Sequence, residues 1–428
     1  MYKQLSAPLT AQVEVTTNCA NLCVHCYNHW RHDHDAEQFS LSVDQATLLA
    51  DKIAAARIFE LVITGGEPLL APDATRTLVR RAGGHGLAVS LNSTLNQLTA
   101  PEAAWLKKHG LTSVLTSLHG PREIHDRIVH RAGAFDATLR GIALAREAGL
   151  PVHVNMVISR TNKDHVVETA RLCQELGVSL FLATKAAQPE NCPGFAAHRL
   201  TRDDISDYVR QVRQADLAIP VEMLSTFPLC GITDNADLAL HGRRCLAGVA
   251  MLTIAADGQV RPCNHTDMAY GSIWTSDLLE IWERMREWRL GGFLPETCRL
   301  CAALMLCGGG CRMEAKTHTG SLTALDPYAR PENLPRILPF LRQREQAPDN
   351  APGAFSINPS RSRQESFGTV LCAIGGAPIM LSPEGARVWR QFSTGRIYFC
   401  DDPGISWGNV NRQAFLAALQ RKKLISAR

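Results

Sequence analysis

Short apolar runs alternate with longer amphipathic segments between residue 10 and about residue 215. The runs are rich in β-branched residues and have the length of buried strands. They predict six strands, at Val13–Thr17, Glu60–Thr64, Leu87–Asn92, Ser113–Leu118, Val152–Ser159 and Ser179–Thr184. The segments after these runs carry apolar residues at helical spacing. They predict helices near residues 42–57, 73–83, 101–109, 135–149, 162–176 and 202–215.

Six strand–helix units in a row predict an α/β fold with a parallel sheet and right-handed crossovers. Periodicity alone does not decide between an open sheet and a sheet curled into a partial barrel. In both cases ligands bind at the carboxyl ends of the strands. Polar side chains at those ends are therefore the first candidates for a site.

The chain changes character after about residue 225, and we predict four parts from its composition. Residues 1–225 form the α/β core, and residues 226–341, dense in Cys and Gly, form a second domain. Residues 342–365 are rich in Pro, Asn, Ser, Gln and Arg, which is typical of a linker. Residues 366–428 recover apolar periodicity and form a small C-terminal domain.

Composition and charge exclude several classes of partner. The chain has 45 Lys and Arg against 41 Asp and Glu, and this net charge of +4 is too small to indicate nucleic acid or a membrane surface. The first residues lack the apolar core of a signal peptide, and no apolar run could span a bilayer. We therefore expect a cytoplasmic protein, in which clustered cysteines indicate metal ligands and not disulfides.

Cys19, Cys23 and Cys26 form the pattern C-x3-C-x2-C near the start of the chain. Three thiolates at this spacing can hold three irons of a [4Fe–4S] cluster and leave one iron open to a small molecule. The alternative is a zinc site, which prefers four closed ligands, commonly as two C-x2-C pairs. No second pair lies near these cysteines, although His25 lies between two of them.

The second predicted strand runs into Gly65-Gly66-Glu67-Pro68. Adjacent glycines let a ligand approach the backbone closely, and a proline stiffens the exit from the strand. Alone, this segment is consistent with an ordinary turn. Placed one strand after the three cysteines, it resembles the radical S-adenosylmethionine (radical SAM) superfamily. That resemblance implies a (β/α)6 partial barrel, a cluster whose open iron binds SAM, and reductive cleavage of SAM to a 5′-deoxyadenosyl radical.

The same resemblance implies further SAM contacts. Gly65, Gly66, Glu67 and Pro68 would hold the amino group of the methionine, while Asn92, Ser117 and Asn155 would contact the ribose or the carboxylate. Arg131 could pair with that carboxylate, and Tyr27 could flank the adenine. The alternatives are loop caps for the strand-end residues, a solvent-facing arginine and a packing role for the tyrosine. His119 stands where relatives often carry Asp.

A second set of cysteines resembles the SPASM domain, which carries auxiliary [4Fe–4S] clusters. Its pattern is Cys245-x12-Gly258-x4-Cys263, then Cys298-x2-Cys301-x5-Cys307-x3-Cys311. The resemblance implies one or two auxiliary clusters, the first held by Cys245, Cys263 and Cys311. The other is held by Cys298, Cys301 and Cys307.

The closing cysteine of that pattern is missing, because Asp326-Pro-Tyr-Ala329 stands where relatives end in a cysteine. We predict that the cluster of Cys298, Cys301 and Cys307 has no fourth cysteine. It would have an open iron, borrow Asp326 or His318, or be lost in favour of a zinc-like knuckle. Cys230 is a candidate fourth ligand for the first cluster, or a small buried apolar residue. We interpret the remaining cysteines as structural: Cys173, Cys192, Cys372 and Cys400.

The C-terminal segment contains two amphipathic helices, Pro383–Phe392 and Arg412–Ile425, and strand-like pieces near 367–373 and 396–400. It loosely resembles the small winged-helix domain that recognises leader peptides of ribosomally made, modified peptides, although a middle helix is lacking. In that fold a leader adds a strand at a sheet edge. The alternative is a cap that stabilises the cluster domain.

Together these resemblances imply an enzyme that abstracts hydrogen from a side chain of a precursor peptide or small protein and forms a C–C or C–S crosslink. An auxiliary cluster would take the second electron, and a flavodoxin or ferredoxin would supply the first. The alternatives are a maturase of a sulfatase-type active site and a non-catalytic iron–sulfur scaffold or sensor. No proton donor or acceptor can be assigned from the sequence.

Overall fold

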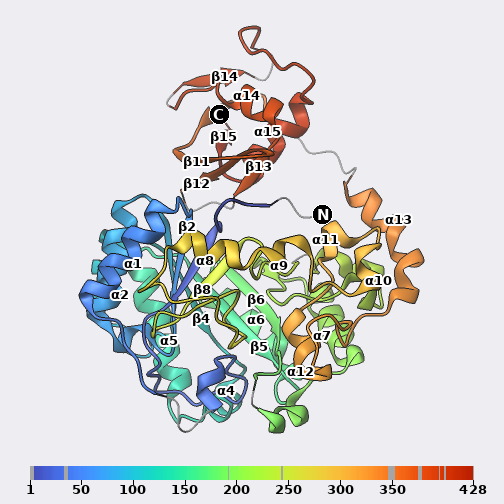
Figure 1. The fold of residues 1–428 in the computed structure, drawn as a ribbon. Helices are drawn as coiled ribbons and strands as arrows, with labels where there is room; N and C mark the ends of the chain where they lie inside the picture. The colour runs from blue at the N-terminus through green and yellow to red at the C-terminus, as the bar shows by residue number, and fades with distance from the viewer. Residues whose placement is uncertain are drawn as a thin grey trace.

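The computed structural model describes residues 4–32, 37–190, 192–241, 244–345, 352–374, 378–394, 396–399 and 402–427. Its centre is the expected parallel sheet, in which consecutive strands are neighbours (Figure 1). The strands are β1 (Thr10–Glu14), β2 (Glu60–Thr64), β3 (Ala88–Asn92), β4 (Leu111–Ser117), β5 (Val152–Ile158) and β6 (Leu180–Lys185). β1 begins three residues earlier than predicted, because Ala11 already shares the inward face with Val13.

Seven helices follow the strands of this core. They are α1 (Val43–Ala55), α2 (Pro72–Gly84), α3 (Ala100–Lys108), α4 (Arg122–Val129), α5 (Ala134–Glu147), α6 (Val166–Glu175) and α7 (Arg202–Gln214). Six of them match predicted helices. The seventh, α4, was not predicted because its eight residues are mostly polar or charged and its apolar face is narrow.

The sheet extends beyond the six predicted strands at both edges. β7 (Val221–Glu222) pairs with β6, and β8 (Met251–Ile254) pairs in parallel with β1. β9 (Val260–Arg261) then pairs antiparallel with β8. Arg261 donates two hydrogen bonds of 2.6 Å to the buried carboxylate of Glu14 on β1. The first strands of the Cys-rich segment therefore belong physically to the core sheet.

The rest of the Cys-rich segment consists of short helices joined by tight turns. They are α8 (Leu278–Arg284), α9 (Arg286–Leu290), α10 (Glu296–Arg299), α11 (Leu304–Cys307), α12 (Arg312–Thr319) and α13 (Leu334–Glu345). Gly308, Gly309 and Gly310 all have φ between 71° and 80°, so the turn from α11 to α12 needs glycine.

The C-terminal unit contains two small antiparallel sheets and two helices. One sheet has the order β14 (Ile397–Phe399), β10 (Ala354–Ile357), β15 (Ile425–Ala427), and the other β11 (Ser360–Glu365), β12 (Gly368–Ala373), β13 (Ile379–Leu381). The helices are α14 (Pro383–Trp389) and α15 (Arg412–Arg421). The linker prediction is thus wrong for part of 342–365, because β10 and β11 lie within it. Polar composition misled us there: β10 buries Phe355, and β11 alternates polar residues against the core.

β11 fastens the C-terminal unit to the amino ends of β1 and β2. The buried guanidinium of Arg363 donates to the carbonyl oxygens of Ala7 (2.6 Å) and Pro8 (2.9 Å), and Arg361 donates to Ile58 O at 2.8 Å. Glu365 accepts a 2.9 Å bond from the backbone N–H of Ser6. Figure 1 shows this unit above the barrel, at the end opposite α4.

Candidate active site

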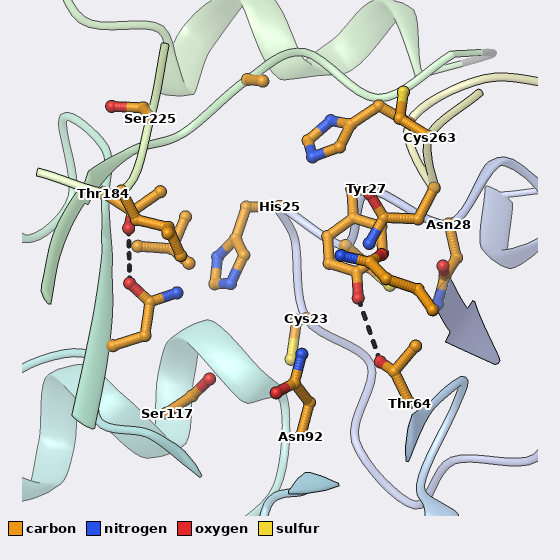
Figure 2. Close-up of a pocket in the computed structure, with 18 of the residues that line it drawn as sticks. Cys23, His25, Tyr27, Asn28, Thr64, Asn92, Ser117, Thr184, Ser225 and Cys263 are labelled. Carbon is orange, nitrogen blue, oxygen red and sulfur yellow. Dashed lines mark hydrogen bonds between the residues drawn. The ribbon is translucent and has the colours of Figure 1, made fainter. Parts of the chain in front are cut away.

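A cavity of about 670 Å³ opens at the carboxyl ends of the barrel strands. Thr64, Asn92, Ser117 and Thr184, at the ends of β2, β3, β4 and β6, all line it. Figure 2 shows Thr184 and Ser117 on one wall and Tyr27 and Thr64 on the other, with His25 between them. The position agrees with the rule for parallel α/β folds.

Two of the three predicted cysteine groups face this one cavity. The N-terminal trio is Cys19, Cys23 and Cys26, and the cavity trio is Cys245, Cys263 and Cys311. The outer trio, Cys298, Cys301 and Cys307, lies outside the lining. The first two groups therefore share one space, which the outer trio does not line.

The loop that carries the N-terminal trio rests on α4. Leu22 N donates to Val129 O at 2.9 Å, and Val24 N donates to Ile128 O at 3.2 Å. Ile128 and Val129 also pack with the side chains of Cys23 and Val24. The helix that the sequence did not predict is therefore the support that fixes this loop.

Gly66 brings the end of β2 into backbone contact with the same loop. Gly66 N donates to Thr16 O and Glu67 N donates to Asn18 O, both at 2.7 Å. A Cβ atom at Gly66 would lie 2.2 Å from Asn18 O, so no larger residue fits without movement of the loop. Since Asn18 directly precedes Cys19, the glycine sets the position of the first cysteine.

Six of the nine predicted SAM contacts line the cavity: Tyr27, Gly65, Gly66, Asn92, Ser117 and Asn155. Glu67, Pro68 and Arg131 lie outside the lining. Asn155 accepts a 2.5 Å hydrogen bond from Thr184, which orients its amide (Figure 2). Arg131 lies near Cys19, where its charge opposes the rise in thiol pKa caused mainly by burial.

Glu67 has a structural contact that explains its place in the motif. Its buried carboxylate accepts hydrogen bonds from Ser93 Oγ (2.6 Å), from Thr94 N (2.7 Å) and from Leu69 N (3.1 Å). These bonds tie the turn after β2 to the loop after β3. Its predicted contact with the methionine amino group therefore gains no support from the side-chain geometry.

Three buried histidines stand beside the N-terminal trio. The ring centroids of His25 and His119 are 4.5 Å apart, and those of His119 and His125 are 5.5 Å apart. Burial lowers the pKa of His25 to about 3 and that of His125 to about 4, and it lowers the pKa of His119 well below its usual range. All three rings are therefore neutral, and His119 is not an anionic substitute for the Asp of relatives.

Several polar atoms at this end of the cavity fit a polar ligand. Within the described residues, Asn21 Oδ1, His25 Nδ1, Asn28 Oδ1 and His125 Nε2 are buried without a hydrogen-bond partner, and all four residues line the cavity. Buried polar groups normally have partners. A SAM molecule on a cluster held by the N-terminal trio would offer these groups both donors and acceptors.

Tyr27 joins the two cysteine groups of the cavity. It follows Cys26, its hydroxyl is 3.4 Å from Thr64 Oγ1, and its ring stacks on His265 with the centroids 4.9 Å apart. His265 lies two residues after Cys263. The predicted adenine contact thus competes with a stacking contact that connects the N-terminal trio to the cavity trio.

Lys185 and Glu314 form an ion pair in the cavity wall that we did not predict. The Lys185 Nζ to Glu314 Oε1 distance is 2.6 Å, and the side chains are 2% and 3% exposed. Burial alone would lower the pKa of Lys185, but Glu314 and Tyr328 outweigh it and the pKa is raised. Because Lys185 ends β6 and Glu314 lies on α12, the pair also bonds the barrel to the Cys-rich segment.

Breaking this pair is expected to be costly. Lys185→Met should lower the free energy of unfolding by about 3–5 kcal/mol, because Glu314 is left charged and buried. Lys185→Met/Glu314→Gln should recover much of that loss. Anaerobic urea unfolding followed by circular dichroism measures both. The exposed pair of Arg210 and Asp207 serves as the control, and Arg210→Met should cost less than about 1 kcal/mol. Equal losses in the single and double variants would contradict this role.

Two kinds of feature are absent from the part of the chain that the structure describes. No helix there is long and apolar enough to cross a membrane. No group of three His, Cys, Asp or Glu side chains there converges closely enough to hold a single metal ion. The second finding concerns single-ion sites such as zinc, since the thiolates of an iron–sulfur cluster bind separate irons.

Comparison with known proteins identifies both parts of the chain. The radical SAM superfamily profile matches residues 13–173, and the SPASM profile, an iron–sulfur cluster-binding domain, matches residues 245–302. The chain is 25% identical to an AdoMet-dependent heme synthase of Oleidesulfovibrio alaskensis, over 73% of this chain and 85% of that protein. It is 28% identical to a PqqA peptide cyclase of Ruegeria pomeroyi, over 75% of this chain and 87% of that protein.

The fold is similar to that of SuiB from Streptococcus suis bound to S-adenosylmethionine. The TM-score is 0.61 at 16% sequence identity, over 76% of this chain and 78% of that chain. A structure of SuiB bound to the precursor peptide SuiA matches equally well. The expected α/β radical SAM fold with a SPASM domain is thereby confirmed.

Proposed function

Because this chain is a radical SAM protein with a SPASM domain, we propose that it oxidatively modifies a peptide or small protein. The observation that carries the proposal is the shared cavity, whose wall contains both the N-terminal trio and the cavity trio. A substrate in that space lies between a site for SAM and a site for an auxiliary cluster. This arrangement suits an oxidation in which hydrogen is removed at one side and an electron is accepted at the other.

In this reaction the chain's own residues would bind the cluster, orient SAM and shield the reacting carbon. Cys19, Cys23 and Cys26 would hold the cluster that supplies reductive cleavage of SAM. Gly65 and Gly66 carry no side chain, which lets the end of β2 lie against the backbone of the cysteine loop and fixes that loop beside the SAM site. The walls of the cavity would shield the reacting carbon from water, while the cofactor carries the bond-breaking chemistry.

A peptide substrate is supported by the size of the cavity and by the relatives. A volume of about 670 Å³ lies in the usual range for sites that hold a small ligand. SAM would occupy part of it, which leaves space for a side chain. The PqqA peptide cyclases and SuiB with its bound precursor peptide indicate the same class of substrate. A C–C or C–S crosslink is the product that we propose.

A second candidate is heme synthesis, which three of the similar proteins favour by name. Those matches cover 73–77% of this chain and 85–98% of the heme synthases, so about a quarter of this chain has no counterpart in them. The PqqA peptide cyclases match a similar share of this chain, 75–81%, so coverage does not separate the two functions. The two functions are separated by testing a peptide and a tetrapyrrole precursor side by side.

The experiment uses the reconstituted full-length protein under oxygen-free conditions, with SAM, a chemical reductant and a short candidate precursor peptide. We expect 5′-deoxyadenosine and a peptide that has lost two hydrogen atoms, as mass spectrometry reports. Heme formation from the tetrapyrrole, with an unchanged peptide, would contradict the proposal and favour the second candidate. If SAM is cleaved with neither the peptide nor the tetrapyrrole, the result would support a scaffold or sensor.

The edge strand β14 provides a test of how the peptide is recruited. Ile397 and Phe399 point to the same outer face, and they are 53% and 58% exposed. Proteins normally cover or charge an apolar edge strand, which prevents it from pairing with another chain. The exposed edge of β14 therefore suits strand addition by a leader peptide. Ile397→Glu/Phe399→Glu should raise the KM for the peptide and leave SAM cleavage unchanged. Leu48→Glu on α1, at a residue 44% exposed, is the matched control. An unchanged KM would favour a stabilising cap.

A further inference from the structure

The short turn Leu229–Gly231 lies directly beside the outer trio. Leu229 N donates to the sulfur of Cys307 at 3.4 Å, and the next residue in the turn is Cys230. Backbone N–H groups that point at sulfur are typical of cysteines that bind iron–sulfur clusters, because they stabilise the thiolate. The turn thus already makes one contact of this kind to an expected ligand.

The same turn packs against the segment in which a closing cysteine was expected. Arg330 N donates to the sulfur of Cys230 at 3.3 Å, and the side chain of Asn333 donates to Cys230 O at 3.1 Å. A Cβ atom at Gly231 would lie 2.4 Å from Tyr328 O, so only glycine permits this approach. The Cys230 sulfur is therefore held next to the backbone that flanks Ala329.

The thiol of Cys230 interacts electrostatically with those of the outer trio. Burial raises the pKa of the Cys230 thiol, the hydrogen bond from Arg330 N lowers it, and the charges of Cys307, Cys298 and Cys301 raise it, which brings it to about 11. The sulfurs of Cys230 and the outer trio would repel one another if all four lost their protons. Bonds to the irons of a cluster would offset that repulsion.

We propose that Cys230 is the fourth ligand of the auxiliary cluster held by Cys298, Cys301 and Cys307. It takes the place of the cysteine that the chain lacks at Ala329. On assembly the thiol of Cys230 loses its proton and its sulfur bonds to the remaining iron. The outer cluster is then fully ligated by cysteine. This inference rests on the SPASM domain and does not depend on the identity of the substrate.

The other candidates for this ligand make other contacts or lie in another part of the chain. Both oxygens of Asp326 accept backbone hydrogen bonds, from Cys311 N at 2.8 Å and from Tyr328 N at 3.0 Å. His318 Nδ1 lies 3.2 Å from Glu314 O on its own helix. Cys372 is buried in β12 of the C-terminal unit. Cys400 lies outside the described residues. The structure therefore favours a fourth cysteine, where we had predicted none.

Cys230→Ala in the reconstituted full-length protein tests the proposal. We expect the outer cluster to lose iron to a chelator several-fold faster than in the wild type, and its electron paramagnetic resonance signal to change. Cys230→Ser, which replaces the sulfur by oxygen, should retain more iron and shift the reduction potential. Cys372→Ala is the control, since it removes a thiol from β12 of the C-terminal unit, and it should change neither property.

A rescue separates loss of a ligand from loss of folding. Ala329→Cys alone should leave the outer cluster unchanged, because the site is already closed. Cys230→Ala/Ala329→Cys should restore the resistance to chelator that Cys230→Ala lost. Iron content, chelator resistance and spectra identical to the wild type in Cys230→Ala would overturn the proposal. So would a gain in chelator resistance from Ala329→Cys alone.

Discussion

A protein in which Cys19, Cys23 and Cys26 are all replaced by Ala is expected to form no 5′-deoxyadenosine above the rate without enzyme. The three thiols line the cavity and come from a single loop. Without them no ligand remains at that end for the iron that cleaves SAM. Liquid chromatography of a reduced, oxygen-free reaction measures the product directly.

The matched control removes the same number of cysteines elsewhere. Cys173 and Cys372 are buried outside the cavity, and Cys192 is also absent from its lining. Cys173→Ala/Cys192→Ala/Cys372→Ala should therefore still cleave SAM. The assignment fails if the N-terminal triple variant cleaves SAM as the wild type does. It also fails if both triple variants are equally inactive while they remain folded.

Among Gly→Ala substitutions in the barrel, Gly66→Ala is expected to lower the free energy of unfolding the most. The new Cβ would lie 2.2 Å from Asn18 O and 2.8 Å from Thr17 O, and both neighbours are backbone atoms. The loop must move, and it carries Cys19. We expect a loss of about 3 kcal/mol in the free energy of unfolding, together with weaker SAM binding and a lower iron content.

The geometry directs the added atom at the cysteine loop, so stability and cofactor binding should fall together. Gly84→Ala is the control, because a Cβ there meets no atom within 4 Å and the residue ends α2. It should stabilise by up to about 1 kcal/mol. If both variants have the same stability, the loop does not constrain Gly66.

The part of the site that follows from strand ends could be predicted from the sequence. Asn92 and Ser117 end β3 and β4 and line the cavity, because parallel strands present their carboxyl ends to one space. The same rule could have identified Lys185, which ends β6. It was missed because its partner Glu314 lies 129 residues away. Without that partner a buried lysine is improbable.

Contacts that depend on tertiary structure could not be predicted. The placement of Cys230 requires a turn and the segment after Asp326 to meet, although they are about a hundred residues apart. Spacing rules describe ligands along one stretch of chain, so they favoured the first auxiliary cluster for Cys230. Glu67 has a contact of the same kind: its motif predicts a place in the SAM site, and its carboxylate also accepts hydrogen bonds from the loop after β3.

The attachment of the C-terminal unit sets a length requirement for any peptide that uses it. The unit is fastened at the amino ends of β1 and β2, whereas the cavity lies at the carboxyl ends. The seven residues of β5 alone span about 23 Å at roughly 3.3 Å per residue. A substrate held at β14 and modified in the cavity must therefore have an intervening stretch of more than about seven extended residues. The length of the barrel would then set a minimum spacing between the recognised segment and the modified residue. Very short peptides would be excluded, and residues far from the recognised end would be selected.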